Sequence, residues 1–186
     1  REVRDGFMAD MWRESGETFE AGIFTQTETI ISLVILVMVA IMVVIKNNFR
    51  AFMLSQGIML AGFLVAGIST FLFLQKDISM FYWMTLVGLG LYMVYIPYNS
   101  LLFDRFIAAF RYAGNVGFLI YIADSFGYLG SVGVLMSKTI FRLNLQWLDF
   151  YTTLVMIAAI TGFAGTVLSL LYFKRRHRFI SASPAA

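Results

Sequence analysis

Long apolar stretches separated by short polar joints form the dominant pattern along this chain. A helix rising about 1.5 Å per residue crosses a hydrocarbon core of roughly 30 Å in some 20 residues, and each stretch approaches or exceeds that length. We place spanning helices at residues 22–45, 51–74, 79–102, 115–135 and 150–173. No segment shows the alternation over about ten residues that a barrel strand requires, and lipid leaves helices as the remaining way to satisfy backbone groups. The sequence therefore predicts an all-α, polytopic membrane helix bundle with five transmembrane helices.

The two ends of the chain differ from this central bundle, residues 22–174. Residues 1–21 are rich in charge, yet apolar residues recur among them at helical spacing: Val3, Phe7, Met8, Met11 and Trp12. That spacing is typical of an amphipathic helix that lies at the membrane interface or continues a span from upstream. A charged linker is the alternative. Residues 175–186 are expected to be a basic cytoplasmic tail.

Composition supports the membrane class and narrows the chemistry. The chain is 60% hydrophobic and 13% charged, whereas a soluble domain is about one-quarter charged. It has no cysteine, which excludes disulfides, thiolate metal sites and cysteine nucleophiles. The one histidine, His177, lies in the tail, so we expect no metal site and no cofactor. The tail's basic residues fit contact with phospholipid headgroups better than binding to nucleic acid.

The distribution of lysine and arginine predicts the orientation. Alternating spans place residues 46–50, residues 102–114 and the tail on one side, with eight basic residues in total. The start, residues 75–78 and residues 136–149 fall on the other side, with six. The positive-inside rule therefore places the C-terminus in the cytoplasm.

Asp124 lies near the middle of the apolar run 115–135. A carboxylate at that depth costs about 2.5–3.5 kcal/mol, so it normally faces a partner or a water-filled cavity. It belongs to a polar stripe on one helix face: Gly117, Tyr121, Asp124, Tyr128 and Ser131. The two tyrosines lie one turn from the carboxylate and can direct hydroxyls toward a shared cavity. In the alternative reading, Asp124 only bonds a neighbouring helix and fixes its packing.

A second stripe follows the third helix through Gly88, Tyr92, Tyr95 and Asn99. Pro97 lacks a backbone donor and should bend or break this helix just before Asn99. Irregular backbone at membrane depth is tolerated where it lines a cavity or is covered by protein. We interpret the stripe as a cavity wall, with an interfacial tyrosine belt as the alternative.

Other residues are assigned to gating or packing. Glu28 lies nearer the outer end of the first span, where a gating role and simple exposure are equally reasonable. The third cytoplasmic segment holds a predicted ion-pair network that can act as a gate: Asp104, Arg105 and Arg111. Glycines that permit close helix approach occur on the fourth and fifth spans: Gly127, Gly130, Gly133, Gly162 and Gly165.

The segment YIPYNSLLFDRFIAAFRYAGNVGFLIYIADSFGYLGS, Tyr95 to Ser131, resembles part of the C-terminal half of a major facilitator superfamily transporter. More narrowly, it is similar to an uncharacterised bacterial family of transporter-like proteins with no assigned substrate. REVRDGFMADMW (Arg1–Trp12) resembles the charged joint before that family's eighth helix, and FTQTETI (Phe24–Ile30) resembles the beginning of that helix. The resemblance implies helices eight to twelve of a twelve-helix protein, with the N-terminal helices as partners. The joint IKNNFR (Ile45–Arg50) departs from the superfamily because it lacks the usual glycine and aspartate.

These observations lead to one expected function and one alternative. We expect a secondary transporter of a small solute, working by alternating access in the bacterial inner membrane. Asp124 would couple transport to a proton or cation, since burial favours the neutral carboxyl group. Residues that would line the cavity are Tyr92, Tyr95, Asn99, Tyr121 and Tyr128. The alternative is a non-transporting scaffold or sensor. An enzyme is not expected, because the bilayer holds no histidine or cysteine and the two carboxylates, Asp124 and Glu28, should lie at different depths.

Overall fold

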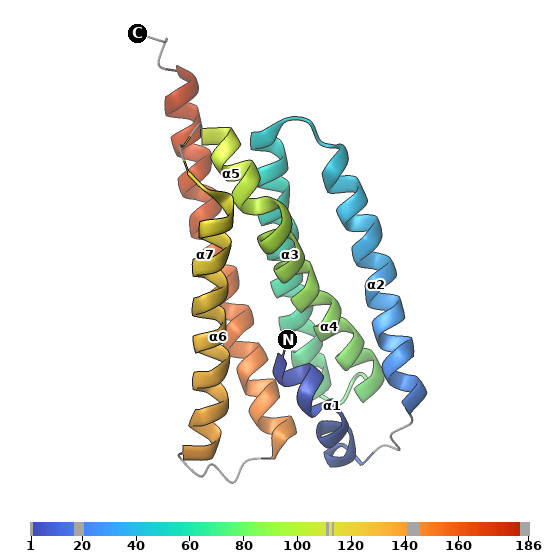
Figure 1. Ribbon diagram of the computed structural model, residues 1–186. Coiled ribbons are helices and arrows are strands. Elements are labelled where there is room, and N and C mark those ends of the chain that lie inside the picture. The colour runs from blue at the N-terminus through green and yellow to red at the C-terminus, as the bar shows by residue number, and fades with distance from the viewer. Residues whose placement is uncertain (1, 17–20, 111, 113, 141–145, 183–186) are drawn as a thin grey trace.

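The computed structural model describes residues 2–16, 21–110, 112, 114–140 and 146–182. These residues form helices joined by short turns (Figure 1). The helices are α1 (Glu2–Glu14), α2 (Ala21–Val44), α3 (Asn48–Leu74), α4 (Met80–Pro97), a π-helical segment (Tyr98–Leu102), α5 (Phe103–Phe110), α6 (Val116–Ile140) and α7 (Trp147–Ala182).

Five helical stretches are long and apolar enough to cross a membrane, which confirms the predicted number among the described residues. They are Thr25–Val44, Asn48–Leu74, Met80–Phe110, Val116–Gly133 and Trp147–His177. The α2–α3 turn, α5 and the end of α7 gather at one end of the bundle, and α1 lies at the other (Figure 1). The third span runs eight residues past its expected end at 102, because the backbone stays helical through the π-helical segment into α5. The basic segment after residue 174 likewise continues α7 to Ala182.

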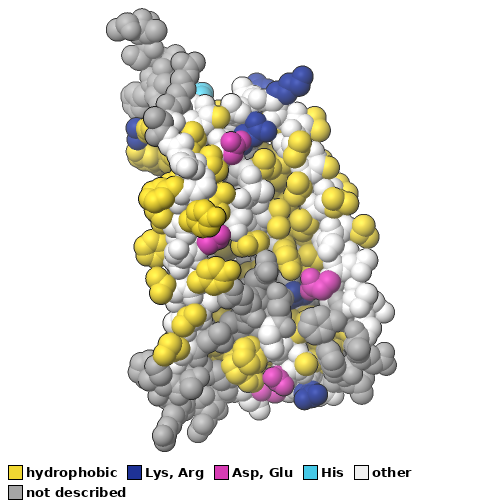
Figure 2. Space-filling view, in the orientation of Figure 1, with side chains coloured by type: hydrophobic (Ala, Val, Ile, Leu, Met, Phe, Trp, Pro, Cys, Tyr) yellow, Lys and Arg dark blue, Asp and Glu magenta, His cyan; other side chains and the backbone are white. Residues whose placement is uncertain are grey.

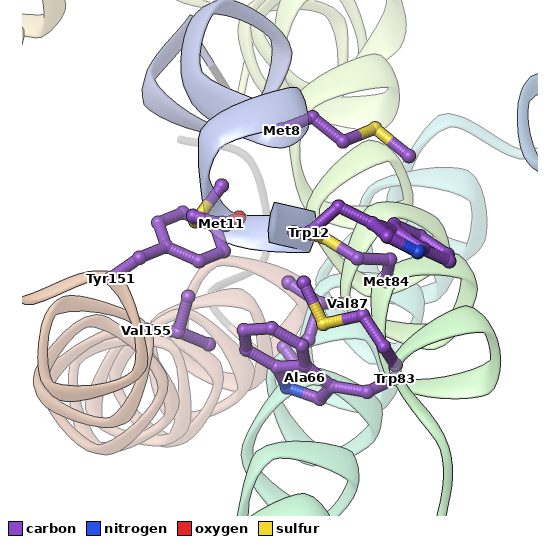
Figure 3. Packing of buried hydrophobic residues seen from close by; sticks show 10 residues of the cluster. Met8, Met11, Trp12, Ala66, Trp83, Met84, Val87, Tyr151 and Val155 are labelled. Atoms are coloured by element: carbon purple, nitrogen blue, oxygen red, sulfur yellow. The ribbon is translucent and has the colours of Figure 1, made fainter. Parts of the chain in front are cut away.

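The N-terminal helix α1 packs inside the bundle. Its apolar side chains join the main core cluster with α4 and α7 (Figure 3): Met8, Met11 and Trp12. The ring of Phe7 stacks on Trp147 at 3.8 Å, and the Glu14 carboxylate accepts a 2.8 Å hydrogen bond from the Leu148 backbone nitrogen. The first turn of α7 therefore receives an acceptor for one of its free N–H groups. The charged start of the chain thus forms a helix within the bundle, attached to the beginning of the last span.

Helices α3 and α4 approach each other most closely at two glycines. A Cβ atom added to Gly62 would lie 2.6 Å from the carbonyl oxygen of Gly90, and one added to Gly90 would lie 2.6 Å from that of Gly62. Nearby, the buried Trp83 stacks on Phe73 at 4.2 Å and donates its indole N–H to the Thr70 hydroxyl at 3.1 Å. Backbone contact and a satisfied indole together make α3 and α4 the tightest pair in the bundle.

Helix α6 has a different environment. None of the residues in its most apolar window, within Val116–Gly133, is buried, whereas every other span buries some of its own window. Figure 1 shows α6 along one side of the bundle. Its side chains are therefore available to lipid, solvent or further protein, and the few polar contacts it makes matter more to its position.

Candidate functional site

The clearest polar contact at membrane depth joins α6 to the π-helical segment. Asn99 directs its side-chain Nδ2 to the carboxylate of Asp124, with 3.3 Å between nitrogen and oxygen. This distance is at the long end for an N–H···O hydrogen bond, so the contact is weak. Both side chains are half-buried, and Asn99 Oδ1 is buried without a hydrogen-bond partner among the described residues. The structure therefore brings together two polar residues singled out in different spans.

The π-helical segment explains how the backbone passes Pro97. Proline lacks the N–H that would continue the α-helical ladder, and the chain widens to a π-helix at Tyr98. The Ser100 hydroxyl donates to the Ile96 carbonyl at 2.6 Å, which satisfies one acceptor near the change in ladder. A bend or break was expected at Pro97, and the structure has instead a wider turn within a continuous helix. Such turns are frequent at functional sites, and Asn99 lies within this one.

The tyrosines of the two predicted stripes are more exposed than they would be if they lined a closed cavity. On α6, Tyr121 is 76% exposed and Tyr128 is 63% exposed, and neither hydroxyl bonds another described residue. On α4, Tyr95 is 39% exposed and Tyr92 is half-buried. Tyr121 and Tyr128 therefore lie on an open face of α6, and the described residues enclose none of these four tyrosines in a sealed pocket. On the face drawn in Figure 2, acidic side chains are few and lie apart from one another, and most lie near a basic side chain.

A second polar pair connects α1 to α2. The guanidinium of Arg4 is fully buried and lies 2.7 Å from the carboxylate of Glu28, which is 34% exposed. Gly88 of α4 makes room for it, because a Cβ there would lie 2.8 Å from the Arg4 guanidinium and 2.7 Å from Ile31. Glu28 therefore has a buried partner and is not simply exposed at an interface.

At the predicted cytoplasmic gate, Arg105 bonds a different residue from the expected one. Arg105 donates from Nη1 to the Asn48 side chain at 2.8 Å, linking α5 to the start of α3. Asp104 is exposed and forms no ion pair with another described residue. Arg111 lies outside the described residues. The structure thus shows one cross-helix bond at this end.

Only one of the five glycines assigned to packing has a close neighbour among the described residues. At Gly162, a Cβ would collide with the ring of Phe63, so α3 and α7 do approach there. At Gly127, Gly130, Gly133 and Gly165, an added Cβ meets no described atom within 4 Å.

Several important residues were not singled out from the sequence. Arg4 lies at helical spacing from Met8 and Met11, two of the apolar residues whose pattern predicted an amphipathic helix. Gly62 lies four residues before Ala66, a small-residue spacing typical of helix contacts in membranes. Asn48 gave no recognisable signal. Among the described residues, no three His, Cys, Asp or Glu side chains cluster as a metal site.

The fold defines a class: an all-helical bundle with five stretches able to span a membrane. Residues 1–176 match a family of unknown function, DUF5690, and the chain belongs to that family. No significant match was found among curated proteins or among solved structures.

Proposed function

We propose that this protein is a secondary transporter of a small solute, with Asp124 as the site of proton or cation coupling. The observation that carries the proposal is the Asn99–Asp124 contact. A carboxylate at the depth of a span, held by an amide from irregular backbone, is the arrangement typical of ion and substrate pathways.

The chemistry of coupling follows from the protonation state of Asp124. The ionised carboxylate accepts from the Asn99 amide and favours the position of α6 in which that bond forms. The neutral carboxyl group is a weaker acceptor and releases part of that attraction. Because α6 has few other contacts, a change at this one bond can shift the balance between two positions of the helix.

The transporter architecture in this proposal is the C-terminal half of a major facilitator. Its support is the resemblance of Tyr95–Ser131 to that superfamily and the open face bordered by Tyr121 and Tyr128. In that arrangement a solute would bind between this bundle and further helices, in the bacterial inner membrane with the C-terminus cytoplasmic. The Arg4–Glu28 pair would act near the outer opening and the Arg105–Asn48 bond near the inner one.

Proton flux provides the test. The protein is reconstituted in liposomes that enclose a pH-sensitive dye, and pools of small polar solutes are added outside. We expect at least one pool to change the internal pH, and Asp124→Asn to abolish that change. The matched control is Asp77→Asn, which removes an exposed carboxylate from the α3–α4 turn and should leave the flux intact.

The outcomes separate the proposal from a scaffold or sensor. A solute-driven pH change that persists in Asp124→Asn would remove the coupling role but leave transport standing. If no pool moves protons and none is taken up, while Asp124→Leu lowers the melting temperature, Asp124 serves helix packing instead.

A further inference from the structure

A pocket of about 250 Å³ lies between α3, the π-helical segment with α5, and α7. Its wall is mainly aromatic. The rings of Phe52, Phe106 and Phe173 contact one another edge-on or tilted, with centroids 5.2–5.7 Å apart. Rings packed at these distances form a defined apolar surface, suited to another flat ring.

One polar side chain on this wall is conspicuous. Gln56 is 2% exposed, and its Oε1 atom is buried without a hydrogen-bond partner among the described residues. A buried amide in that state is costly unless something completes its hydrogen bonds. Rotation of the terminal amide presents either its carbonyl or its NH₂ group, so a hydroxyl group can pair with it in either orientation.

Size restricts what can fit. An apolar cavity of about 150 Å³ in a protein core accommodates benzene. The larger volume here leaves room for one aromatic ring with a small substituent. The Tyr98 side chain also lines the pocket, one residue before Asn99.

We infer that this pocket is a binding site for a single-ring aromatic alcohol, whose ring lies against the phenylalanines and whose hydroxyl pairs with the Gln56 amide. The inference is independent of the proposed transport function. It needs only the α3–α5–α7 packing, which the aromatic contacts hold together.

The probe is 4-fluorophenol, titrated into the full chain in lipid nanodiscs and followed by fluorine NMR, with empty nanodiscs as the baseline for partition into lipid. We expect a saturable shift with the protein. Gln56→Met keeps the length of the side chain and removes the amide, so it should weaken binding about tenfold. The same change should not weaken the binding of fluorobenzene, which has no hydroxyl group.

A blocking variant tests the location. Gly165 lines the pocket and an added Cβ meets no described atom within 4 Å, so Gly165→Leu has room for its side chain and should abolish the saturable shift. Gly57→Leu is the matched control, because Gly57 is exposed and equally unobstructed. On the wild type, the much bulkier 2,4,6-tri-tert-butylphenol should fail to compete.

Three results would overturn the inference: no saturable shift, a shift unchanged in Gly165→Leu, or equal weakening of 4-fluorophenol and fluorobenzene by Gln56→Met. Where Gly165→Leu fails to fold, as judged by its thermal unfolding, competition by the bulky phenol on the wild type decides.

Discussion

Replacing Gly90 by alanine should force α3 and α4 apart. The added Cβ would lie 2.6 Å from the Gly62 carbonyl oxygen and 2.9 Å from the Ala66 backbone nitrogen, whereas ordinary contact begins at 3.4 Å. Both obstacles are helix backbone and cannot rotate aside. The helices must therefore separate by about 0.8 Å, the difference between 3.4 and 2.6 Å. A gap of roughly 0.5–1 Å forfeits about a quarter to a half of each dispersion contact that it opens.

The expected loss of stability follows from two opposing terms. Overpacking a filled contact costs about 1–3 kcal/mol, and a backbone obstacle places this case at the upper end. Alanine's better helix propensity returns about 1 kcal/mol. We expect Gly90→Ala to lower the free energy of unfolding by about 2 kcal/mol. The matched control is Gly130→Ala on α6, where the new methyl group meets no described atom within 4 Å. It should leave stability unchanged or raise it by up to about 1 kcal/mol.

Tryptophan fluorescence can follow this change. Trp83 is buried on α4 and stacks on Phe73 of α3, so separation of the two helices changes its surroundings. The purified protein is unfolded reversibly in mixed micelles by increasing SDS, and the free energies of wild type and both variants are compared. If Gly90→Ala proves as stable as Gly130→Ala, the close backbone contact between α3 and α4 is refuted.

Two further changes test buried polar contacts by the same unfolding measurement. Glu28→Gln leaves the buried Arg4 guanidinium without its counter-charge; because Glu28 is one-third exposed, we expect a loss of about 2–3 kcal/mol, between the values for surface and buried pairs. Asp10→Asn, which alters only an exposed pair on α1, should change stability little, and equal losses in the two variants would contradict a buried ion pair. Thr70→Val removes the acceptor of the Trp83 indole and should cost about 1–3 kcal/mol, whereas Thr70→Ser should restore most of it. A Thr70→Val protein as stable as wild type would show that the indole does not depend on this bond.

The membrane class and the five spans could be predicted because length and apolar content alone determine them. Asn99 and Asp124 could each be named as candidates from the sequence for a related reason. Few polar residues occur at membrane depth, so few of them can pair. Neither stripe could show that Tyr121 and Tyr128 are mostly exposed. Exposure depends on which helices are neighbours, and periodicity identifies a face without naming what covers it.

Helix packing was harder to predict than helix position. The repeated glycines of α6 have a stronger pattern than Gly62 or Gly90, yet an added Cβ would clash at Gly62 and Gly90 and meets no described atom within 4 Å at Gly127, Gly130 or Gly133. A small residue permits close approach but does not supply the partner. The burial of Arg4 on α1 depends in the same way on the space beside Gly88, three helices later in the sequence.

The π-helical segment sets the rotational phase between α4 and α5. Each residue of an α-helix advances the direction of the side chain by about 100°. A π-helical turn takes one residue more than an α-helical turn. If Tyr98–Leu102 kept all its residues but took the α form, the side chains of α5 would emerge about 100° around the axis, and Arg105 would turn away from Asn48. The wider turn absorbs this residue and so keeps the two halves of the third span facing their different neighbours.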